Sequence, residues 1–383
     1  MKILFVDQSG DPGGAELSLM DLACTYREDC LVALFYDGLF RQLLEDQGIS
    51  CQVLETQSLT VRKEGGLLQV LGNGWKFLPL VQKIAQLSRE YDVVYANTPK
   101  ALVVTAIAHL IEPRPLIYHL RDFLSKAHFS WFNRQLLVQL ANRCATTVIA
   151  NSKATQQAFI ESGGNSQLTR VVYNGFVPER YERTTADATQ TRQTLGLEGK
   201  FVVGHFSRIS PWKGQHVLIE ALSYCTTDVV AILVGGDFFG ADAYVEELKQ
   251  TVQALHLEDR VRFLGFHSDV ASLMAACDVI THTSTAPEPF GRVIIEAMLC
   301  GRPIIGAAAG GAIELIDHQK TGWLCSPEDA HALATLIMDC RNQPQKTDEI
   351  ALAAKQYATQ QFHLSHTAHQ VQQLIDEALK TKT

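Results

Sequence analysis

Two glutamates eight positions apart are the first candidates for chemistry. Glu288 and Glu296 enclose the stretch Glu288-Pro289-Phe290-Gly291-Arg292-Val293-Ile294-Ile295-Glu296, which follows a buried run and leads into a helical pattern. Carboxylates accept hydrogen bonds well from sugar hydroxyls. Gly291 lets backbone approach a ligand closely, and the unpaired N–H groups of a first helical turn suit a phosphate. The spacing fits a diphosphate flanked by sugars, but a capping Glu288 and a solvated Glu296 fit equally well.

Two cations follow a predicted strand at Val202–Phe206. Arg208 and Lys213 lie in the loop Arg208-Ile209-Ser210-Pro211-Trp212-Lys213-Gly214. A planar guanidinium fork and a compact ammonium can together clamp a pyrophosphate and stabilise charge on a departing phosphate. The alternative is two surface cations beside a helix start. That alternative is weakened because cations near a helix N-terminus oppose its dipole.

Glycine-rich loops follow two further predicted strands. One is Gly10-Asp11-Pro12-Gly13-Gly14-Ala15-Glu16, and the other is Leu233-Val234-Gly235-Gly236-Asp237. Such glycines permit a tight turn and close approach of backbone to an anion. The spacing of the first loop departs from the G-x-G-x-x-G dinucleotide fingerprint. A plain structural turn is at least as compatible with that loop as an anion site.

A histidine ends another predicted strand, in Tyr118-His119-Leu120-Arg121-Asp122. A lone histidine is more often structural than catalytic, but ligands of open α/β sheets bind beyond the carboxyl ends of strands. The sequence contains no Asp-x-Asp pair, and its nine cysteines are scattered without metal-ligand spacing. We therefore expect no metal, and reduced thiols of a cytoplasmic protein.

The elements that must position these residues alternate along the chain. Short β-branched runs predict strands at 2–6, 31–36, 92–96, 116–119, 146–150, 171–173, 201–206, 229–234, 261–264, 278–283 and 303–305. Helical patterns lie between them, for example at 15–26, 75–89, 154–162, 215–223 and 241–255. This alternation predicts βαβ units and buried parallel sheets.

A polar stretch at Val177–Gly199 interrupts the alternation, which then restarts. We therefore predict an α/β fold of two doubly wound, Rossmann-like domains, residues 1–178 and 179–364. The helical tail, residues 365–383, is expected to cross back onto the first domain. With 383 residues, 46% of them hydrophobic, the chain has ample apolar material for two cores.

Net charge and hydropathy argue against several other classes of protein. The formal net charge of −8 argues against a general nucleic-acid binder. No run approaches the ~18 apolar residues of a transmembrane helix, and the N-terminal run is too short for a signal peptide. Basic and aromatic residues mix in the segment Arg62–Arg89. This segment predicts either peripheral contact with an anionic membrane or, somewhat more strongly, a solvated helix over the core.

Taken together, the chain resembles the retaining glycosyltransferases of family four, which have two facing Rossmann-like domains, the GT-B fold. Their Glu-x7-Glu signature is met by Glu288 and Glu296, and their Arg-x4-Lys pair by Arg208 and Lys213. Their Gly-Gly-Ala-Glu loop is met by residues 13–16. The resemblance spans almost the entire length, and the motifs occur in the family's order.

The resemblance implies a nucleotide-diphosphate-sugar donor, bound mainly by the second domain without a metal. Glu288 would contact the transferred sugar, Glu296 the ribose, and Arg208 with Lys213 the diphosphate, while His119 would lie near the reacting sugar. Further donor contacts are implied for Gly13, Gly14, Gly235, Gly236, Phe266, Phe290, Gly291, Arg292 and Val293. Acceptor-side positions are implied for Glu16, Arg121 and Asp122.

The resemblance further implies transfer with retention of anomeric configuration, in polysaccharide or glycoconjugate biosynthesis. UDP-glucose or a related UDP-hexose is the expected donor, and the hydroxyl of a saccharide or lipid-linked saccharide is the expected acceptor. A nucleotide-sugar epimerase and a non-catalytic nucleotide-sugar-binding protein are the alternatives. An NAD-dependent oxidoreductase using Asp37 is disfavoured by the glycine spacing.

Overall fold

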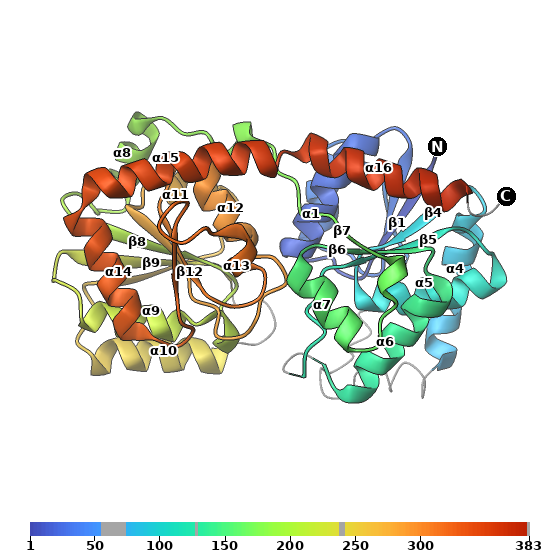
Figure 1. The fold of residues 1–383 in the computed structure, drawn as a ribbon, viewed down its shortest axis with the longest axis horizontal. Coiled ribbons are helices and arrows are strands. Elements are labelled where there is room, and N and C mark those ends of the chain that lie inside the picture. Colours follow the sequence, from blue (N-terminus) through green and yellow to red (C-terminus); the bar gives the residue numbers. More distant parts are fainter. Residues whose placement is uncertain (55–73, 127–128, 237–241, 381–383) are drawn as a thin grey trace. The chain divides into compact units, whose positions relative to one another are not determined.

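The computed structural model describes residues 1–54, 74–126, 129–236 and 242–380. The chain divides into two compact units, one formed by Met1–Phe176 with Leu364–Thr383 and the other by Val177–His363. Each unit holds one parallel sheet with helices on both faces (Figure 1). The predicted doubly wound α/β class is therefore confirmed.

The first unit is built on a seven-stranded sheet of order β3-β2-β1-β4-β5-β6-β7. Its strands are β1 Ile3–Asp7, β2 Cys30–Leu34, β3 Cys51–Val53, β4 Val93–Ala96, β5 Leu116–Leu120, β6 Thr147–Ala150 and β7 Thr169–Val171. Its helices are α1 Gly14–Ala23, α2 Leu39–Asp46, α4 Gly74–Ser88, α5 Pro99–Ile111, α6 Trp131–Cys144, α7 Lys153–Glu161 and α16 Leu364–Lys380.

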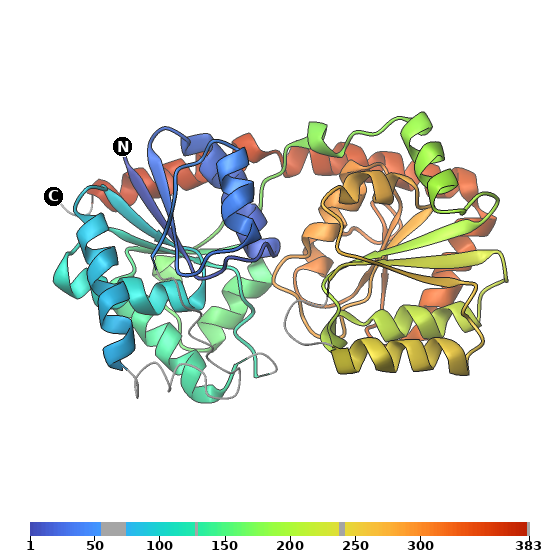
Figure 2. The same ribbon diagram turned by 180° about the vertical axis from the view of Figure 1, so that it is seen from behind.

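The central strand β1 supplies two cores, because successive side chains point to opposite faces. In β1, Ile3 and Phe5 join the core beneath α1 and α16, whereas Leu4 and Val6 join the core beneath α4, α5 and α6. Figure 2 shows these two layers from behind. The chain's last helix, α16, therefore completes one face of the unit with which the chain begins.

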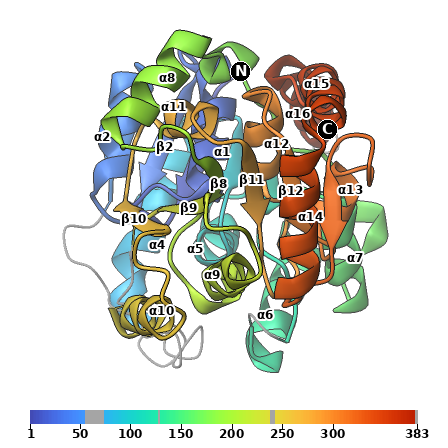
Figure 3. The ribbon, with the colours of Figure 1, turned by 90° about the vertical axis from the view of Figure 1, so that its left-hand side faces the viewer.

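The second unit is built on a six-stranded sheet of order β10-β9-β8-β11-β12-β13. Its strands are β8 Phe201–Phe206, β9 Val229–Val234, β10 Val261–Gly265, β11 Val279–His282, β12 Ile304–Ala307 and β13 Trp323–Cys325. Its helices are α8 Thr185–Thr194, α9 Gln215–Ser223, α10 Asp242–Ala254, α11 Val270–Ala275, α12 Arg292–Leu299, α13 Ala312–Leu315, α14 Ala330–Asn342 and α15 Pro344–Gln361. Figure 3 looks along this sheet, with α9 and α10 beneath it and α11 and α12 above.

Both sheets reverse their strand order at one point. In the first unit β1 lies between β2 and β4, and in the second β8 lies between β9 and β11. The loops leaving neighbouring strands diverge at such a switch point and open a crevice for ligands. The glycine-rich loop at Gly13 follows β1, Lys213 follows β8, and Glu288 follows β11.

The sequence-based elements differ from the structure mainly at sheet edges. The strands β3 and β13 were not predicted, and β7 lies two residues earlier than the predicted 171–173. Each of these strands has only three residues. A run of that length is too short to display the period-two alternation by which a strand is recognised.

The basic segment is described only in part. Residues 55–73, which include Arg62 and Lys63, lie outside the described residues. Helix α4 buries Phe77, Leu80 and Ile84 in the core of the first unit. Within the described ranges, no helix has the length and apolar character needed to cross a bilayer. Contact of this segment with a membrane stays a prediction.

Candidate functional site

A buried ion pair occupies the switch point of the second unit. The Lys213 Nζ donates to the Glu288 Oε1 at 2.6 Å, and each side chain is only 13% exposed. Lys213 ends the short turn η4, Pro211–Lys213, which follows β8, and Glu288 lies in the loop after β11. Because β8 and β11 are hydrogen-bonded neighbours, the two loops meet at one edge of the sheet. Two predicted site residues are thereby brought together.

The second oxygen of Glu288 is held by residues that the sequence analysis did not single out. The Oε2 atom is hydrogen-bonded to the Nε2 of His282, the last residue of β11, and accepts from the Ser284 Oγ at 2.9 Å. Ser284 also lies 3.2 Å from the His282 Nε2. The available signal was the polar run His282-Thr283-Ser284, which begins at the last residue of β11 and precedes Glu288.

These contacts keep Glu288 ionised. Burial alone would raise the pKa of the Glu288 carboxyl, but the charges of Lys213 and His282 and their hydrogen bonds outweigh it and hold that pKa well below its usual range. Nearby, burial lowers the pKa of His205 to about 3, assisted by the charge on His282. His205 is therefore neutral, and its Nε2 lies 3.0 Å from the Thr283 Oγ1.

Two glycines allow the loops that follow β8, β9 and β11 to approach one another closely. Gly214 begins α9 with φ 71°, and a Cβ there would lie 2.0 Å from the Thr283 carbonyl oxygen. Gly235 has φ 151°, and a Cβ there would lie 1.8 Å from the Ser207 carbonyl oxygen. An L side chain fits neither position without moving backbone. Asp237, predicted beside Gly236, lies outside the described residues.

Helix α12 begins beside Glu288. Its N-cap is Gly291, in the left-handed conformation with φ 97°. The N–H of Gly311 donates to the Glu288 carbonyl at 2.8 Å, which ties the loop after β12 to this site. Gly310 and Gly311 were also missed, because their contact depends on the adjacency of β11 and β12.

The second glutamate of the motif lies on α12. The Arg292 Nε donates to the Glu296 Oε1 at 3.2 Å, and the Tyr181 hydroxyl lies 3.4 Å from the same oxygen. Tyr181 was not among the predicted residues. The remaining predicted positions range from buried to exposed: Phe290 is buried, Val293 and Gly236 are partly exposed, and Arg208 and Phe266 are exposed.

A second polar cluster lies at the switch point of the first unit. Gly13 is the N-cap of α1, and its N–H donates to the Glu16 Oε2 at 2.9 Å. Beside it, the Asn97 Nδ2 donates to the Asp7 Oδ2 at 2.6 Å. Burial raises the pKa of Asp7 to about 6, and burial with the nearby Asp7 raises that of Glu16 to about 8. Asp7 and Asn97 were not predicted.

Predicted acceptor-side residues extend this cluster across the sheet. The Arg121 Nε donates to the Asn97 Oδ1 at 2.5 Å, and an Arg121 Nη donates to the Asn174 Oδ1 at 2.7 Å. Arg121 follows β5, Asn97 follows β4 and Asn174 follows β7. Arg121 therefore joins three strand ends, and Asp122 lies in the same loop.

His119, on β5, is buried beside this cluster. Its Nδ1 lies 2.5 Å from the Tyr95 hydroxyl, and its Nε2 is buried without a hydrogen-bond partner in the part of the chain that is described. Burial, with the charge on Arg121, holds the pKa of His119 well below its usual range. His119 is therefore neutral.

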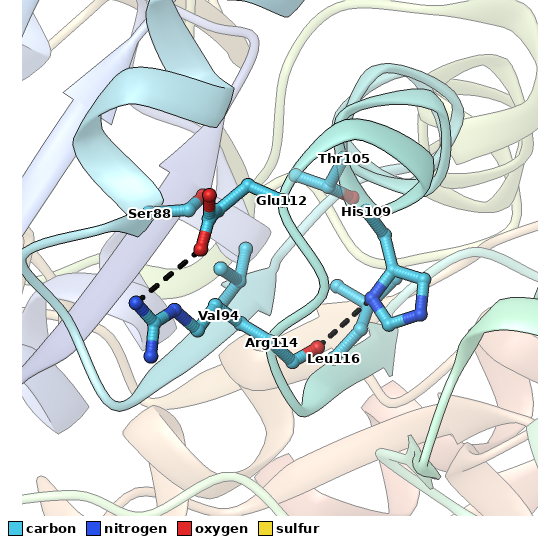
Figure 4. Close-up of a pocket in the computed structure, with 7 residues that line it drawn as sticks. All are labelled: Ser88, Val94, Thr105, His109, Glu112, Arg114 and Leu116. Atoms are coloured by element: carbon cyan, nitrogen blue, oxygen red, sulfur yellow. Dashed lines mark hydrogen bonds and ion pairs between the residues drawn. The ribbon is translucent and has the colours of Figure 1, made fainter.

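Hollows elsewhere do not contain the predicted residues. One of about 10 Å³ lies at the amino ends of β4 and β5, and its walls are shown in Figure 4: Ser88, Val94, Thr105, His109, Glu112, Arg114 and Leu116. It has room for no more than a water molecule. A larger one, about 460 Å³, lies between α13 and α15. Among the described residues, no three His, Cys, Asp or Glu side chains form a metal-binding group.

Comparison with known proteins gives two family matches. The family described as Glycosyltransferase Family 4 matches residues 12–180, and the family described as Glycosyl transferases group 1 matches residues 187–359. These matches cover the two units in turn and leave short segments at each end. Residues 12–16 of the first glycine-rich loop, the whole second glycine-rich loop, the Arg208–Lys213 loop and the two glutamates fall inside them.

Solved structures give a match over the full length. HepE of Anabaena in complex with UDP-glucose is 52% identical, with 100% of both chains covered and a TM-score of 0.91. The same protein in complex with UDP and glucose matches at 52% identity and a TM-score of 0.92, covering 98% of this chain and 99% of that one. Sucrose-phosphate synthase from Thermosynechococcus elongatus, 21% identical with a TM-score of 0.84, shares the fold.

Curated relatives match over a shorter part. N-acetyl-alpha-D-glucosaminyl L-malate synthase of Bacillus anthracis is 32% identical over 215 residues, which are 55% of this chain and 54% of that protein. Spore coat protein SA of Bacillus subtilis is 31% identical over 210 residues. The chain spans about half the length of these relatives.

Proposed function

The chain belongs to the family-four glycosyltransferases of the GT-B fold, and from this premise we propose that it transfers a sugar from a UDP-sugar, UDP-glucose first, to a hydroxyl of a saccharide or lipid-linked saccharide. The observation that carries the choice of donor is the full-length similarity, at 52% identity, to a protein crystallised with UDP-glucose. Transfer proceeds with retention of anomeric configuration and without a metal.

The second unit binds the donor. Lys213 and Arg208 hold the diphosphate, and the N–H groups at the start of α12 assist them. Glu288 accepts hydrogen bonds from the transferred sugar and Glu296 from the ribose, while Phe266 lies by the base. Support comes from the shared position of Lys213 and Glu288 at the switch point between β8 and β11. The roles at the donor expected for Gly13, Gly14 and His119 stay predictions.

Charge stabilisation on the departing diphosphate does most of the chemical work. The sugar–phosphate bond breaks first, and the acceptor hydroxyl attacks from the face that the leaving group vacates. The acceptor proton passes to the leaving diphosphate. Lys213 and Arg208 supply the positive charge that this step needs. The buried cationic position of Lys213 supports this role.

A ligand panel followed by a transfer assay tests the proposal. UDP and UDP-glucose are expected to raise the melting temperature more than GDP or ADP, because only a bound ligand stabilises the folded state. With EDTA present, transfer should continue and the product should keep the donor's anomeric configuration, as read by NMR. Stabilisation by UDP-glucose without transfer to any hydroxyl acceptor would favour the non-catalytic alternative, and a changed free nucleotide sugar would favour the epimerase.

Replacement of Lys213 tests the role of its cation. Lys213→Ala is expected to lower turnover by roughly 10²–10³, the usual loss of one charge-stabilising group. Arg341→Ala, which removes a partly exposed cation paired with Asp228 at 2.7 Å in the same unit, is the control and should keep its turnover. Full activity of Lys213→Ala would contradict the assignment.

A further inference from the structure

Glu288 and Lys213 have two tasks that conflict. The proposed function directs the Lys213 ammonium to a diphosphate and the Glu288 carboxylate to sugar hydroxyls. In the structure the two groups are bound to each other at 2.6 Å. A diphosphate carries more negative charge than one carboxylate, so donor binding draws the ammonium away from Glu288. The carboxylate is then left buried without its cation.

Among the described residues, two other side chains hold the Glu288 carboxylate, and both contact its Oε2. The contacts come from His282 and from the Ser284 hydroxyl at 2.9 Å. Neither partner belongs to the loop whose cations are proposed to bind the diphosphate, since His282 ends β11 and Ser284 follows it. These contacts can therefore persist while Lys213 changes partner. They keep one face of the carboxylate fixed and satisfied.

We propose that His282 is a positioning residue, which anchors the Glu288 carboxylate through its Nε2 while Lys213 exchanges from Glu288 to the donor diphosphate. This inference rests on the proposed function, because it deepens the roles given there to Glu288 and Lys213. His282 does not touch the donor itself. Its effect reaches the transferred sugar only through the orientation and charge of Glu288.

The Nε2 of His282 is the ring nitrogen that holds Glu288. It faces the Glu288 Oε2, and because an ionised carboxylate can only accept, this nitrogen donates. The Nδ1 is buried and has no hydrogen-bond partner among the residues described. The ring therefore holds the Glu288 Oε2 through this one hydrogen bond from its Nε2–H.

The titratable surroundings of Glu288 limit what a pH experiment can report. Lys213 faces it from η4, His282 from β11 and His205 from β8. His205, whose pKa burial lowers to about 3, stays neutral over the usable range. Removing the His282 donor should raise the pKa of Glu288, because one interaction that favours the carboxylate is lost.

Two substitutions separate the hydrogen bond from the histidine ring. His282→Leu removes the donor, whereas His282→Gln keeps an N–H near the Nε2 position but does not titrate. UDP-glucose and UDP are titrated into each variant by calorimetry. We expect His282→Leu to bind UDP-glucose about tenfold or more weakly, the scale of one hydrogen bond to a charged group. Affinity for UDP alone should stay within about twofold, and His282→Gln should recover most of the loss.

The pH dependence provides a readout that a merely structural role would not move. Below neutrality the affinity of His282→Leu for UDP-glucose should begin to fall at a higher pH than that of the wild type, since protonation of Glu288 removes its acceptor. His282→Gln should follow the wild type. Equal shifts in both variants would mean that the hydrogen bond from the Nε2–H is not responsible, and would overturn the proposal. Unchanged affinity and pH profile in His282→Leu would also overturn it.

Two further variants test whether the effect of His282→Leu comes from misfolding or from the replacement of any histidine in this unit. Ser284→Ala removes the other donor to Oε2 with a small change of volume, and should weaken UDP-glucose binding selectively but less than His282→Leu. His216→Gln is the matched control: His216 lies on α9 of the same unit, its Nδ1 2.8 Å from the Tyr244 hydroxyl, and should bind as the wild type does.

Failure of the proposed function has a different signature. If wild-type protein binds UDP-glucose no more tightly than UDP, or neither ligand, the donor assignment fails before any variant is compared. If the wild type binds UDP-glucose and both His282 variants and Ser284→Ala bind it equally well, the donor assignment stands and the positioning role of His282 is overturned.

Discussion

Two glutamates near the carboxyl ends of central strands have opposite protonation states. Glu288 faces a lysine, and its pKa lies well below the usual range although burial opposes this. Glu16 faces a backbone N–H and the acid Asp7, and burial raises its pKa to about 8. Glu288 lies in the loop after β11, and Glu16 lies in the first turn of α1, the helix that follows β1. The charge of a motif residue is thus set by its buried neighbours, which the motif itself does not include.

The pKa of Glu16 predicts a loss of stability with rising pH. The folded state keeps its proton up to about pH 8, whereas the unfolded chain loses it near the ordinary value of 4.5. Between these values the folded state binds more protons, so the free energy of unfolding falls as pH rises. Glu16→Gln keeps an acceptor for the Gly13 N–H without a titratable proton. Its unfolding free energy, from urea titrations at pH 5, 6.5 and 8, should fall less than that of the wild type.

Asp7, with a pKa of about 6, remains in this variant and should leave a residual slope at the lower pH values. Glu45→Gln, at an exposed residue of α2 paired with Arg41, should follow the wild-type slope. Parallel curves for Glu16→Gln and the wild type would show that Glu16 is ionised in the folded state.

At the level of elements, the loops between strands and helices approach one another so closely that a side chain does not fit at some positions. Gly214 and Gly265 share a φ of 71°, but their surroundings differ. A Cβ on Gly214 would meet the Thr283 carbonyl oxygen at 2.0 Å, whereas nothing lies within 4 Å of one on Gly265. The two glycines therefore separate the cost of the left-handed backbone from the cost of close packing.

Alanine at these two positions tests that separation. Gly265→Ala should lower the free energy of unfolding by about 1–2 kcal/mol, the cost of a left-handed backbone at one residue. Gly214→Ala carries the same cost and should lose roughly 1–3 kcal/mol more through overpacking. Urea unfolding measures both. Equal losses would mean that the loop after β8 moves aside freely.

Elements with a strong local pattern could be predicted from the sequence. The strands at 201–206 and 229–234 and the helix at 215–223 have the predicted bounds, since each is long and regular in its hydrophobic pattern. The α/β class followed from their alternation. Three-residue edge strands were missed or shifted because so short a run displays no period.

Residues of the candidate site could be predicted only where the short stretch of sequence around them was informative by itself. Glu288 and Lys213 were found from their loops, but their ion pair depends on the pairing of β8 with β11. His282, Asp7 and Asn97 were missed for the same reason. Their role comes from partners that are distant in the sequence and adjacent only across a sheet.

At the scale of the whole molecule, each unit has its own core and the chain visits the first unit twice. Helix α16 places Val371, Leu374 and Ile375 in the core that β1 and α1 share. The Leu364 N–H donates to the Phe176 carbonyl at 2.8 Å, and the Thr367 hydroxyl donates to the Tyr173 carbonyl at 3.0 Å. The polar and apolar contacts of α16 thus stabilise the unit that begins at Met1.

Truncation of a buried side chain on α16 should therefore destabilise strands and helices that are distant from it in the sequence. Ile375 is fully buried, so Ile375→Ala should lower the stability of the first unit by about 2–5 kcal/mol. Amide hydrogen exchange should accelerate in β1, β2 and α1 and stay unchanged in β8, β9 and α9. Leu352→Ala, at a residue 59% exposed on α15, is the control and should change stability by no more than about 0.5 kcal/mol. Acceleration in both units alike would contradict a separate first core.

The position of α16 also bears on the order in which a ribosome lets this protein fold. The strands and helices of Met1–Phe176 are synthesised before Val177–His363, yet the helix α16 that completes their outer layer is synthesised after it. The unit formed by Val177–His363 is complete in sequence before that point. During synthesis, the half that emerges second is therefore able to reach its native state before the half that emerges first.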